Sequence, residues 1–301
     1  MPQRISFHDE IARNKLKSMF LIVLVFAVLL AIGFIIGMAL GPDYFTIIMI
    51  ISIIISVFYV WIGYYNSHTI ALASVSAKPA SEREYREFHN IVEGLALASG
   101  LPKPKLYVMN DNNINAFASG RDPKHAVICV TTGALEKLDK HELEGILAHE
   151  MSHIANYDIR FMTLTAVLVG MIAIISEIFL RSLWYSSLDG DRDNRINIFF
   201  IIMGVILAIL APLVVQLVQL AISRRREYTA DASAVKFTRT PTGLIKALKK
   251  IQHEHLPSTQ EKHHYNKAVA PLFIADPFKK LSGLFQTHPP LEKRIEILER
   301  M

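Results

Sequence analysis

The sequence predicts a mainly α-helical, multi-pass membrane protein with four transmembrane helices and an α+β part on the cytoplasmic side. Composition is the first observation behind this fold class. Of the 301 residues, 51% are hydrophobic and the mean hydropathy is +0.31, which is more apolar than an ordinary soluble domain. The second observation is a set of four apolar runs, each close to the roughly 20 residues that cross about 30 Å of hydrocarbon. The third is a mixture of helical and extended patterns in the polar segments between and after these runs.

The first two apolar runs cover about residues 19–40 and 45–65. Only residues 41–44 separate them, so a tight helical hairpin is expected. The first run is too long for a cleaved signal peptide and has no convincing cleavage site, which indicates a retained anchor. The second run ends in aromatic residues of the kind that lie at a membrane–water interface. These residues are Tyr59, Trp61, Tyr64 and Tyr65.

The third and fourth apolar runs cover about residues 161–180 and 196–222. The third contains Glu177 near one end, where Arg181, one helical turn later, can pair with it. An alternative for these two runs is a buried helical hairpin inside the soluble part. The expected organisation is an N-terminal segment with a membrane hairpin (1–65), a cytoplasmic part (66–160), a second hairpin (161–222) and a second cytoplasmic part (223–301).

Charge predicts the orientation of the chain in the membrane. The net charge is +5, and basic residues gather before the first run and after the last. Such clusters fit anchoring against anionic lipid better than nucleic-acid binding. The expected partner is therefore a lipid bilayer, and no nucleic-acid partner is expected. A cytoplasmic N-terminus and four crossings bring residues 66–160 and 223–301 to the same, cytoplasmic side. The clusters are Arg4, Arg13, Lys15 and Lys17 before the first run and Arg224, Arg225 and Arg226 after the last.

Residues 149–153 read His-Glu-Met-Ser-His, the H-E-x-x-H pattern. On a helix, positions i and i+4 lie on one face, so His149 and His153 can hold one zinc ion together. Glu150 projects beside them, where a carboxylate can take a proton from water. The pattern therefore indicates a zinc hydrolase. The alternative is a buried helix with two hydrogen-bonded histidines.

The residues before this motif predict the helix that it needs. Asp139 followed by Glu142 matches a capping box that begins a helix. Leu143, Ile146 and Leu147 form an apolar stripe that would bury that helix.

The other polar segments predict a small sheet and several helices. A second capping box at residues 81–84 would begin a helix that ends before Gly100. Residues 105–109, 115–119 and 125–130 read as strands of a small antiparallel sheet, with a turn at residues 120–124. The strand at Asn115 is the candidate edge for binding an extended substrate, with an ordinary core hairpin as the alternative. Helices are also expected at residues 227–235, at 241–252 and from Glu292 onward, and the His-rich residues 253–271 read as a solvated loop.

A catalytic zinc ion needs a third protein ligand. The third His of a metzincin would fall at position 159, which is Ile159, so a Glu from a second helix is expected, as in gluzincins. Glu227 has the best location, because it follows the fourth run and would lie beside the H-E-x-x-H helix. Asp231, one turn later, could bond a ligand imidazole. The alternative for Glu227 is an interfacial carboxylate paired with Arg224 or Arg225, and the other candidate ligands are Glu177, Glu254, Glu261, Glu292, Glu296 and Glu299.

Five segments in this order resemble the HtpX heat-shock membrane protease family, which is related to the CAAX prenyl proteases. They are residues 10–15, 115–120, 149–158, 225–231 and 287–291. The resemblance implies a zinc endopeptidase of the cytoplasmic membrane, with one zinc ion per chain and an active site that faces the cytoplasm. It assigns zinc to His149, His153 and Glu227, and catalysis to Glu150. It also implies that Asn115 and Ala116 lie in the substrate-binding strand and that His288 and Arg294 lie near the substrate and the developing oxyanion.

Three functions fit these expectations. The first is proteolytic quality control of misfolded or damaged membrane proteins in a stress response. The second is a dedicated protease that processes one peptide or a lipidated protein. The third is a non-catalytic membrane scaffold, against which the intact Glu150 argues. No ATP-binding P-loop is present in the sequence, so no nucleotide partner is expected.

Overall fold

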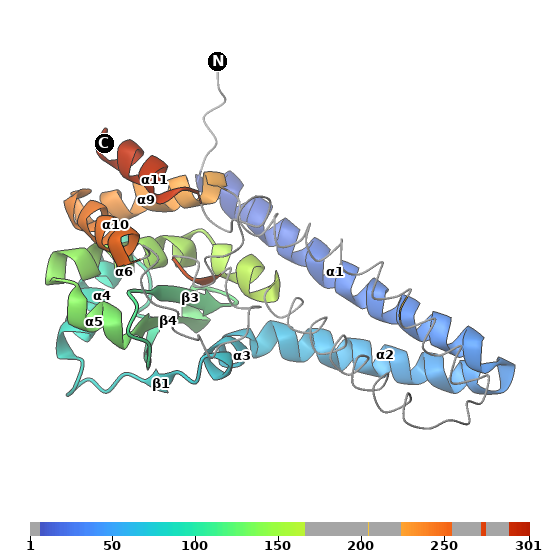
Figure 1. Ribbon diagram of the computed structural model, residues 1–301. Coiled ribbons are helices and arrows are strands. Elements are labelled where there is room, and N and C mark those ends of the chain that lie inside the picture. The colour runs from blue at the N-terminus through green and yellow to red at the C-terminus, as the bar shows by residue number, and fades with distance from the viewer. Residues whose placement is uncertain (1–6, 166–203, 205–223, 255–271, 275–288) are drawn as a thin grey trace, which may run out of the picture.

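The computed structural model describes residues 7–165, 204, 224–254, 272–274 and 289–301 (Figure 1). These residues are mainly helical, with one four-stranded sheet. Most of the third and fourth apolar runs, His288 and nearly all of the His-rich loop lie outside the described residues.

Helices α1 (Phe7–Leu40) and α2 (Pro42–Tyr65) form a hairpin whose two helices extend away from the rest of the described chain (Figure 1). Within them, Asn14–Met38 and Pro42–Tyr65 are long and apolar enough to cross a membrane. The predicted four-residue connection is wrong, because Gly41 alone joins the helices. Pro42 begins α2 in the first turn, where its missing N–H costs no helical hydrogen bond, and Gly41 adopts a φ of 99°, which favours glycine.

After α3 (Ser67–Ser74) and β1 (Lys78–Pro79), the chain enters α4 (Arg86–Ser99). The capping box predicted at residues 81–84 is wrong: Tyr85 is the N-cap, and no side chain caps this helix. The backbone N–H of Ala80 donates to the carbonyl of Leu106, which keeps the chain extended beside the sheet and leaves residues 82–84 in a turn. The predicted end is confirmed, since Gly100 caps α4 with a φ of 70°.

The sheet contains β1, β2 (Lys105–Met109), β4 (Ala126–Thr131) and β3 (Ala116–Gly120), in that spatial order. Strands β3 and β4 form the predicted antiparallel hairpin, but β2 and β4 are parallel, so the purely antiparallel sheet was a wrong prediction. The chain passes from β2 to the outer position β3 and then turns back into the middle. Because β4 reverses β3, it runs in the same direction as β2.

Strand β3 lies at an edge of the sheet, as predicted. The first part of this edge is covered by residues 272–274: Ile274 donates its backbone N–H to the carbonyl of Ala116, 3.0 Å away. Phe273 bridges Phe117, with ring centroids 5.2 Å apart, and both side chains are completely buried.

Helix α6 (Lys140–Ala155), which follows the short α5 (Thr132–Lys137), carries the H-E-x-x-H residues and packs against β3 and α4. Its predicted capping box is confirmed. The carboxylate of Asp139 accepts hydrogen bonds from the backbone of His141 and Glu142, and the carboxylate of Glu142 accepts one from Asp139. The predicted apolar stripe is also confirmed, because Leu143, Ile146 and Leu147 are buried.

Three later helices complete the packing around α6: α9 (Arg224–Thr238), α10 (Thr242–Glu254) and α11 (Leu291–Leu298). The backbones of α6 and α10 touch at two glycines. A Cβ atom at Gly145 would lie 2.4 Å from the nitrogen of Leu244, and one at Gly243 would lie 2.1 Å from the oxygen of His141. This contact holds the start of α10 directly against α6, one turn before His149.

Candidate metal centre

Helix α6 presents His149 and His153 on one buried face. Their side chains are 1% and 6% exposed, and their Nε2 atoms lie 3.2 Å apart. The spacing of four residues produces this arrangement, because it brings both side chains to the same side of the helix.

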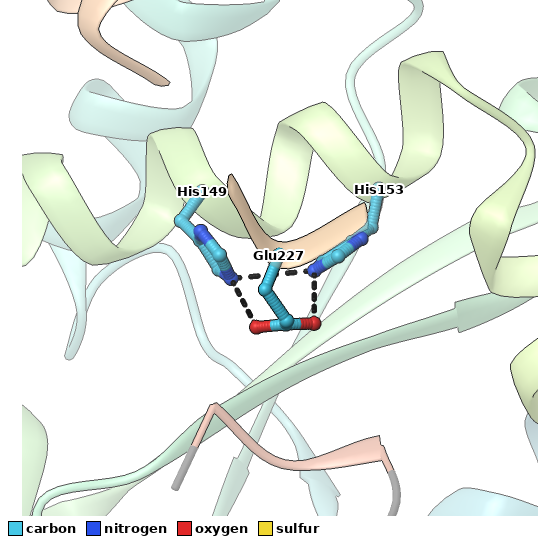
Figure 2. A group of neighbouring side chains, drawn as sticks. All are labelled: His149, His153 and Glu227. Atoms are coloured by element: carbon cyan, nitrogen blue, oxygen red, sulfur yellow. Dashed lines mark hydrogen bonds and ion pairs between the residues drawn. The ribbon is translucent and has the colours of Figure 1, made fainter. Parts of the chain in front are cut away.

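Glu227, from the first turn of α9, faces these two nitrogens (Figure 2). One carboxylate oxygen lies 3.6 Å from Nε2 of His149, and the other lies 3.6 Å from Nε2 of His153. The three side chains are buried, and their candidate ligand atoms all lie within 4.8 Å of one another. The structure therefore brings together the three residues that the sequence singled out for metal binding.

Each imidazole has a carboxylate on its far side. Nδ1 of His149 lies 2.9 Å from Oδ1 of Asp231, and Nδ1 of His153 lies 3.2 Å from Oδ2 of Asp158. A carboxylate accepts a hydrogen bond from Nδ1–H, so it keeps the hydrogen on that nitrogen and leaves the lone pair on Nε2. Both lone pairs then point toward the space in front of Glu227.

This donor set fits a zinc ion. Two imidazole nitrogens at about 2.0–2.1 Å from zinc, in a tetrahedral arrangement, lie about 3.3 Å apart, close to the observed 3.2 Å. Two nitrogen lone pairs at that distance repel each other unless a proton or a metal ion lies between them. Two imidazoles and one carboxylate also match the ligands that zinc accepts in catalytic sites.

Arg294 of α11 completes the surroundings of the site. Its Nε and Nη2 atoms lie 2.9 Å and 2.6 Å from the two oxygens of Asp231, and its Nη1 lies 3.5 Å from Glu227. Burial raises the pKa of Asp231, but the charge of Arg294 and the hydrogen bond with His149 outweigh it and lower that pKa. The resemblance implied a place for Arg294 near the substrate, and the structure shows its guanidinium fully buried beside Asp231 and Glu227.

The same network sets the proton affinity of His149. Burial and the charge of Arg294 lower its pKa, but the hydrogen bonds with Asp231 and Glu227 outweigh them and raise it to about 9. A metal ion at Nε2 therefore competes with a proton at neutral pH.

Glu150 lies in the same buried region, next to strand β3. Its side chain is nearly inaccessible, and burial raises the pKa of its carboxyl group. The charges of the two histidines and a hydrogen bond from the backbone N–H of Ala118 oppose this effect. A carboxyl group with a raised pKa is suited to accepting and returning a proton near neutral pH.

The remaining predicted site residues fall in different places. Asn115 and Ala116 are buried at the start of β3, where the backbone of Asn115 bonds the side chain and backbone of Thr131. His288, Glu177 and Glu261 lie outside the described residues. Glu254 is paired with Lys137 and with the backbone N–H of Ile114, away from the imidazoles. Glu292, Glu296 and Glu299 are on or next to α11 and exposed. Among the candidates that the structure describes, Glu227 is therefore the one that the fold brings to the histidines.

Sequence reasoning missed Asp158. It follows the end of α6, where Tyr157 adopts a φ of 59° and interrupts the helix before residues 158–165 continue as helix. The available signal was a carboxylate five residues after the second histidine, but that spacing fits no regular helix and does not place the carboxylate near His153.

Comparisons with known proteins identify the family of this chain. The model of peptidase family M48 matches residues 82–301. The chain is 45% identical to the "Protease HtpX homolog" of Caldanaerobacter subterraneus subsp. tengcongensis, over 96% of both chains. It is 43% identical to that of Thermoanaerobacter pseudethanolicus, over 99% of both chains, and 40% identical to that of Streptococcus pyogenes serotype M3, over 98% of this chain and 99% of the relative.

A solved structure is also similar in fold. The crystal structure of S. mikatae Ste24p superposes with a TM-score of 0.50 and 21% sequence identity, covering 95% of this chain. The chain spans 65% of the length of that protein.

Proposed function

Because the chain belongs to peptidase family M48 and is a membrane metalloprotease, we propose that its metal is one zinc ion held by His149, His153 and Glu227. One observation carries the proposal: the Nε2 atoms of both histidines and the carboxylate of Glu227 converge in a buried space, within 4.8 Å of one another. Asp231 and Asp158 keep the imidazoles in the tautomer that leaves Nε2 available.

Glu150 is the proposed general base. When bound, zinc supplies a Lewis acid that lowers the pKa of water and polarises a carbonyl group. Glu150 takes a proton from the attacking water and then gives it to the leaving amine of the cleaved peptide bond. Its burial favours this cycle, because the raised pKa lets the carboxyl group hold the proton between the two steps.

The substrate is proposed to lie extended along β3, next to Glu150. The position of β3 at the sheet edge supports this, because an edge strand offers backbone groups to an added strand. Asn115 and Ala116 belong to this strand region, although the carbonyl of Ala116 already accepts the hydrogen bond from Ile274. His288 and Arg294 are proposed to lie near the substrate carbonyl, where a hydrogen-bond donor to an oxyanion is worth roughly 3 kcal/mol.

The proposed topology has four membrane crossings, at about residues 19–40, 45–65, 161–180 and 196–222. The basic clusters that flank these runs support a cytoplasmic N-terminus and an active site on the cytoplasmic side of the cell membrane. In this arrangement residues 66–160 and 223–301 form the catalytic part and meet at the zinc site. The contacts of α6 with α9 and α10 support that division.

The proposed substrates are cytoplasmic segments of misfolded or damaged membrane proteins. A site close to the bilayer suits such substrates, and the alternative is dedicated processing of one peptide or lipidated protein. Trapping with the inactive variant Glu150→Gln, followed by mass spectrometry, separates the two: many unrelated membrane proteins support quality control, and one dominant protein supports processing.

The catalytic assignment is tested with the full chain purified in detergent. Zinc content and casein cleavage are measured for the wild type, Glu150→Gln and Glu227→Ala. We expect Glu150→Gln to keep its zinc and lose cleavage, and Glu227→Ala to lose both. Cleavage by Glu150→Gln would refute the role of Glu150 as the general base. Full zinc occupancy of Glu227→Ala would mean that another residue is the third ligand. Wild-type protein with zinc but no cleavage would favour the scaffold.

A further inference from the structure

Helix α1 carries a buried stripe that is polar at the end nearest the metal site and apolar beyond it. Asn14 and Ser18 are 5% and 1% exposed, and Leu21 and Val25 continue the stripe one and two turns later. Leu21 and Val25 pack with Phe161 and Leu164, so α1 is docked on the segment that follows the H-E-x-x-H helix. An asparagine is an unexpected residue to bury in an anchor helix unless its amide has a partner.

The amide of Asn14 has two partners, both far away in the sequence. Its Nδ2 atom donates to Oδ1 of Asp158, 2.7 Å away, and to the backbone oxygen of Asn156, 3.0 Å away. Both partner atoms can only accept, so the nitrogen of the amide, and not its oxygen, must face them.

Asp158 connects this amide to the metal site. One of its carboxylate oxygens accepts from Asn14, and the other lies 3.2 Å from Nδ1 of His153. The chain of contacts therefore runs from the membrane anchor through a carboxylate to an imidazole whose Nε2 faces Glu227. A carboxylate fixed at both oxygens cannot rotate away from the imidazole.

The turn that presents Asp158 needs support. Tyr157 has a φ of 59°, a conformation that a bulky residue adopts only when its surroundings impose it. Asn14 holds the carbonyl of Asn156 on one side of this turn and the carboxylate of Asp158 on the other. The ammonium of Lys15 lies 4.5 Å from the centre of the Tyr157 ring. Two successive residues of α1 therefore clamp the turn.

We propose that Asn14 is a positioning residue of the metal site, and that α1 is a structural part of that site as well as an anchor. Asn14 fixes Asp158, Asp158 fixes the tautomer and orientation of His153, and His153 binds zinc. The inference rests on the proposed ligand role of His153. It means that displacement of α1 from the 156–158 turn weakens the metal site without touching a ligand.

The test is a double-mutant cycle in zinc affinity, measured by chelator competition on the full chain in detergent. Removing a carboxylate that holds a ligand imidazole lowers metal affinity about 10–100-fold, which is the expectation for Asp158→Ala. We expect Asn14→Ala to lower zinc affinity about tenfold in the wild type and to have no further effect in the Asp158→Ala background. Ser18→Ala is the matched control, because Ser18 is also buried one turn along α1 and, among the described residues, its hydroxyl donates to the carbonyl of Asn14 and not to the 156–158 turn. The zinc affinity of this variant should stay within about twofold of the wild type.

A second pair of variants covers the case in which Asn14→Ala folds poorly. Asn14→Asp places two carboxylates against each other and should weaken zinc more than Asn14→Ala does. In the double variant N14D/D158N the carboxylate at position 14 accepts from the amide nitrogen at position 158, which turns the amide oxygen toward Nδ1 of His153. Zinc affinity should therefore recover relative to Asn14→Asp alone. A purely structural role for Asn14 predicts no such recovery.

His153→Ala separates the outcomes. If His153→Ala loses zinc while Asn14→Ala binds it like the wild type, the positioning role is wrong and the ligand assignment stands. Equal losses from Asn14→Ala in the wild type and in the Asp158→Ala background also overturn the positioning role. If His153→Ala keeps zinc at wild-type affinity, His153 is not a ligand, and the positioning role of Asn14 is wrong as well.

Discussion

Arg294 and Asp231 form a two-point ion pair, with Nη2 2.6 Å from Oδ1 and Nε 2.9 Å from Oδ2, and both side chains are buried. This pair ties α11 to α9 directly behind His149. A buried ion pair adds little net stability when it is intact, but removal of one partner leaves the other charge buried and uncompensated.

Arg294→Ala is expected to destabilise the protein by about 3–5 kcal/mol, because Asp231 would lose its counter-charge. The measurement is thermal or denaturant unfolding of the detergent-solubilised chain. Arg300→Ala is the control: its side chain is 73% exposed and pairs with Glu296 on the surface, so the change should be within about 0.5 kcal/mol. Similar effects of the two variants would contradict a special role for Arg294.

Asp231→Asn is expected to lower zinc affinity about 10–100-fold. An amide at this position can donate to Nδ1 of His149, which moves the proton to Nε2 and blocks the nitrogen that faces Glu227. Asp122→Asn is a matched control, because Asp122 lies 2.8 Å from Nδ1 of His125 in a second Asp–His pair outside the metal site. Zinc affinity should be unchanged in that control, and an equal loss in both variants would refute the argument.

Gly145→Ala is expected to destabilise the fold by about 1–3 kcal/mol, because its Cβ would lie 2.4 Å from the backbone nitrogen of Leu244. The backbones of α6 and α10 must then separate. Gly94→Ala on α4 is the control, and its stability should change in the opposite direction. Nothing lies within 4 Å of a Cβ atom at this position, and alanine in a helix should stabilise the fold by about 0.5–1 kcal/mol. Unfolding curves of the two variants should therefore shift in opposite directions.

The cap of α6 gives a pH dependence. Hydrogen bonding from the backbone of Glu142 lowers the pKa of Asp139 in the folded protein. The ionised carboxylate of Asp139 therefore contributes fully to stability above its unfolded-state pKa of about 4. This contribution is lost as the pH falls through the lower pKa of the folded state. Asp139→Asn keeps a good cap but does not titrate. The wild type should be the more stable of the two at neutral pH, and the difference should close on acidification. A difference that is constant from pH 6 to pH 3 would count against this origin.

Local patterns made α6 predictable from sequence. Asp139 and Glu142 lie three residues apart, His149 and His153 four, and each spacing has a direct meaning on a helix. Glu227 was found because the chemistry of zinc requires a third ligand and the membrane runs restrict where it can lie. These predictions needed only short-range geometry and one chemical rule.

The contacts that hold the ligands were not predictable in this way. Asn14 and Asp158 are 144 residues apart, and Arg294 and Asp231 are 63 apart. No periodicity links such residues, and the left-handed conformation of Tyr157 that turns Asp158 back toward His153 leaves no mark in the sequence. The prediction that β2 and β4 are antiparallel was wrong for a similar reason. Their relative direction depends on the position that β3 takes in the sheet and not on the residues of either strand.

The dependence of Asp231 on Arg294 has a consequence for biosynthesis. Translation delivers the anchor helices, both histidines and Glu227 before it reaches residue 294. Until then, one of the carboxylates that orient the ligands has no guanidinium beside it, and α11 has not yet closed over α9. The network that orients His149 is therefore completed only when the last described helix has been synthesised and its guanidinium has reached Asp231.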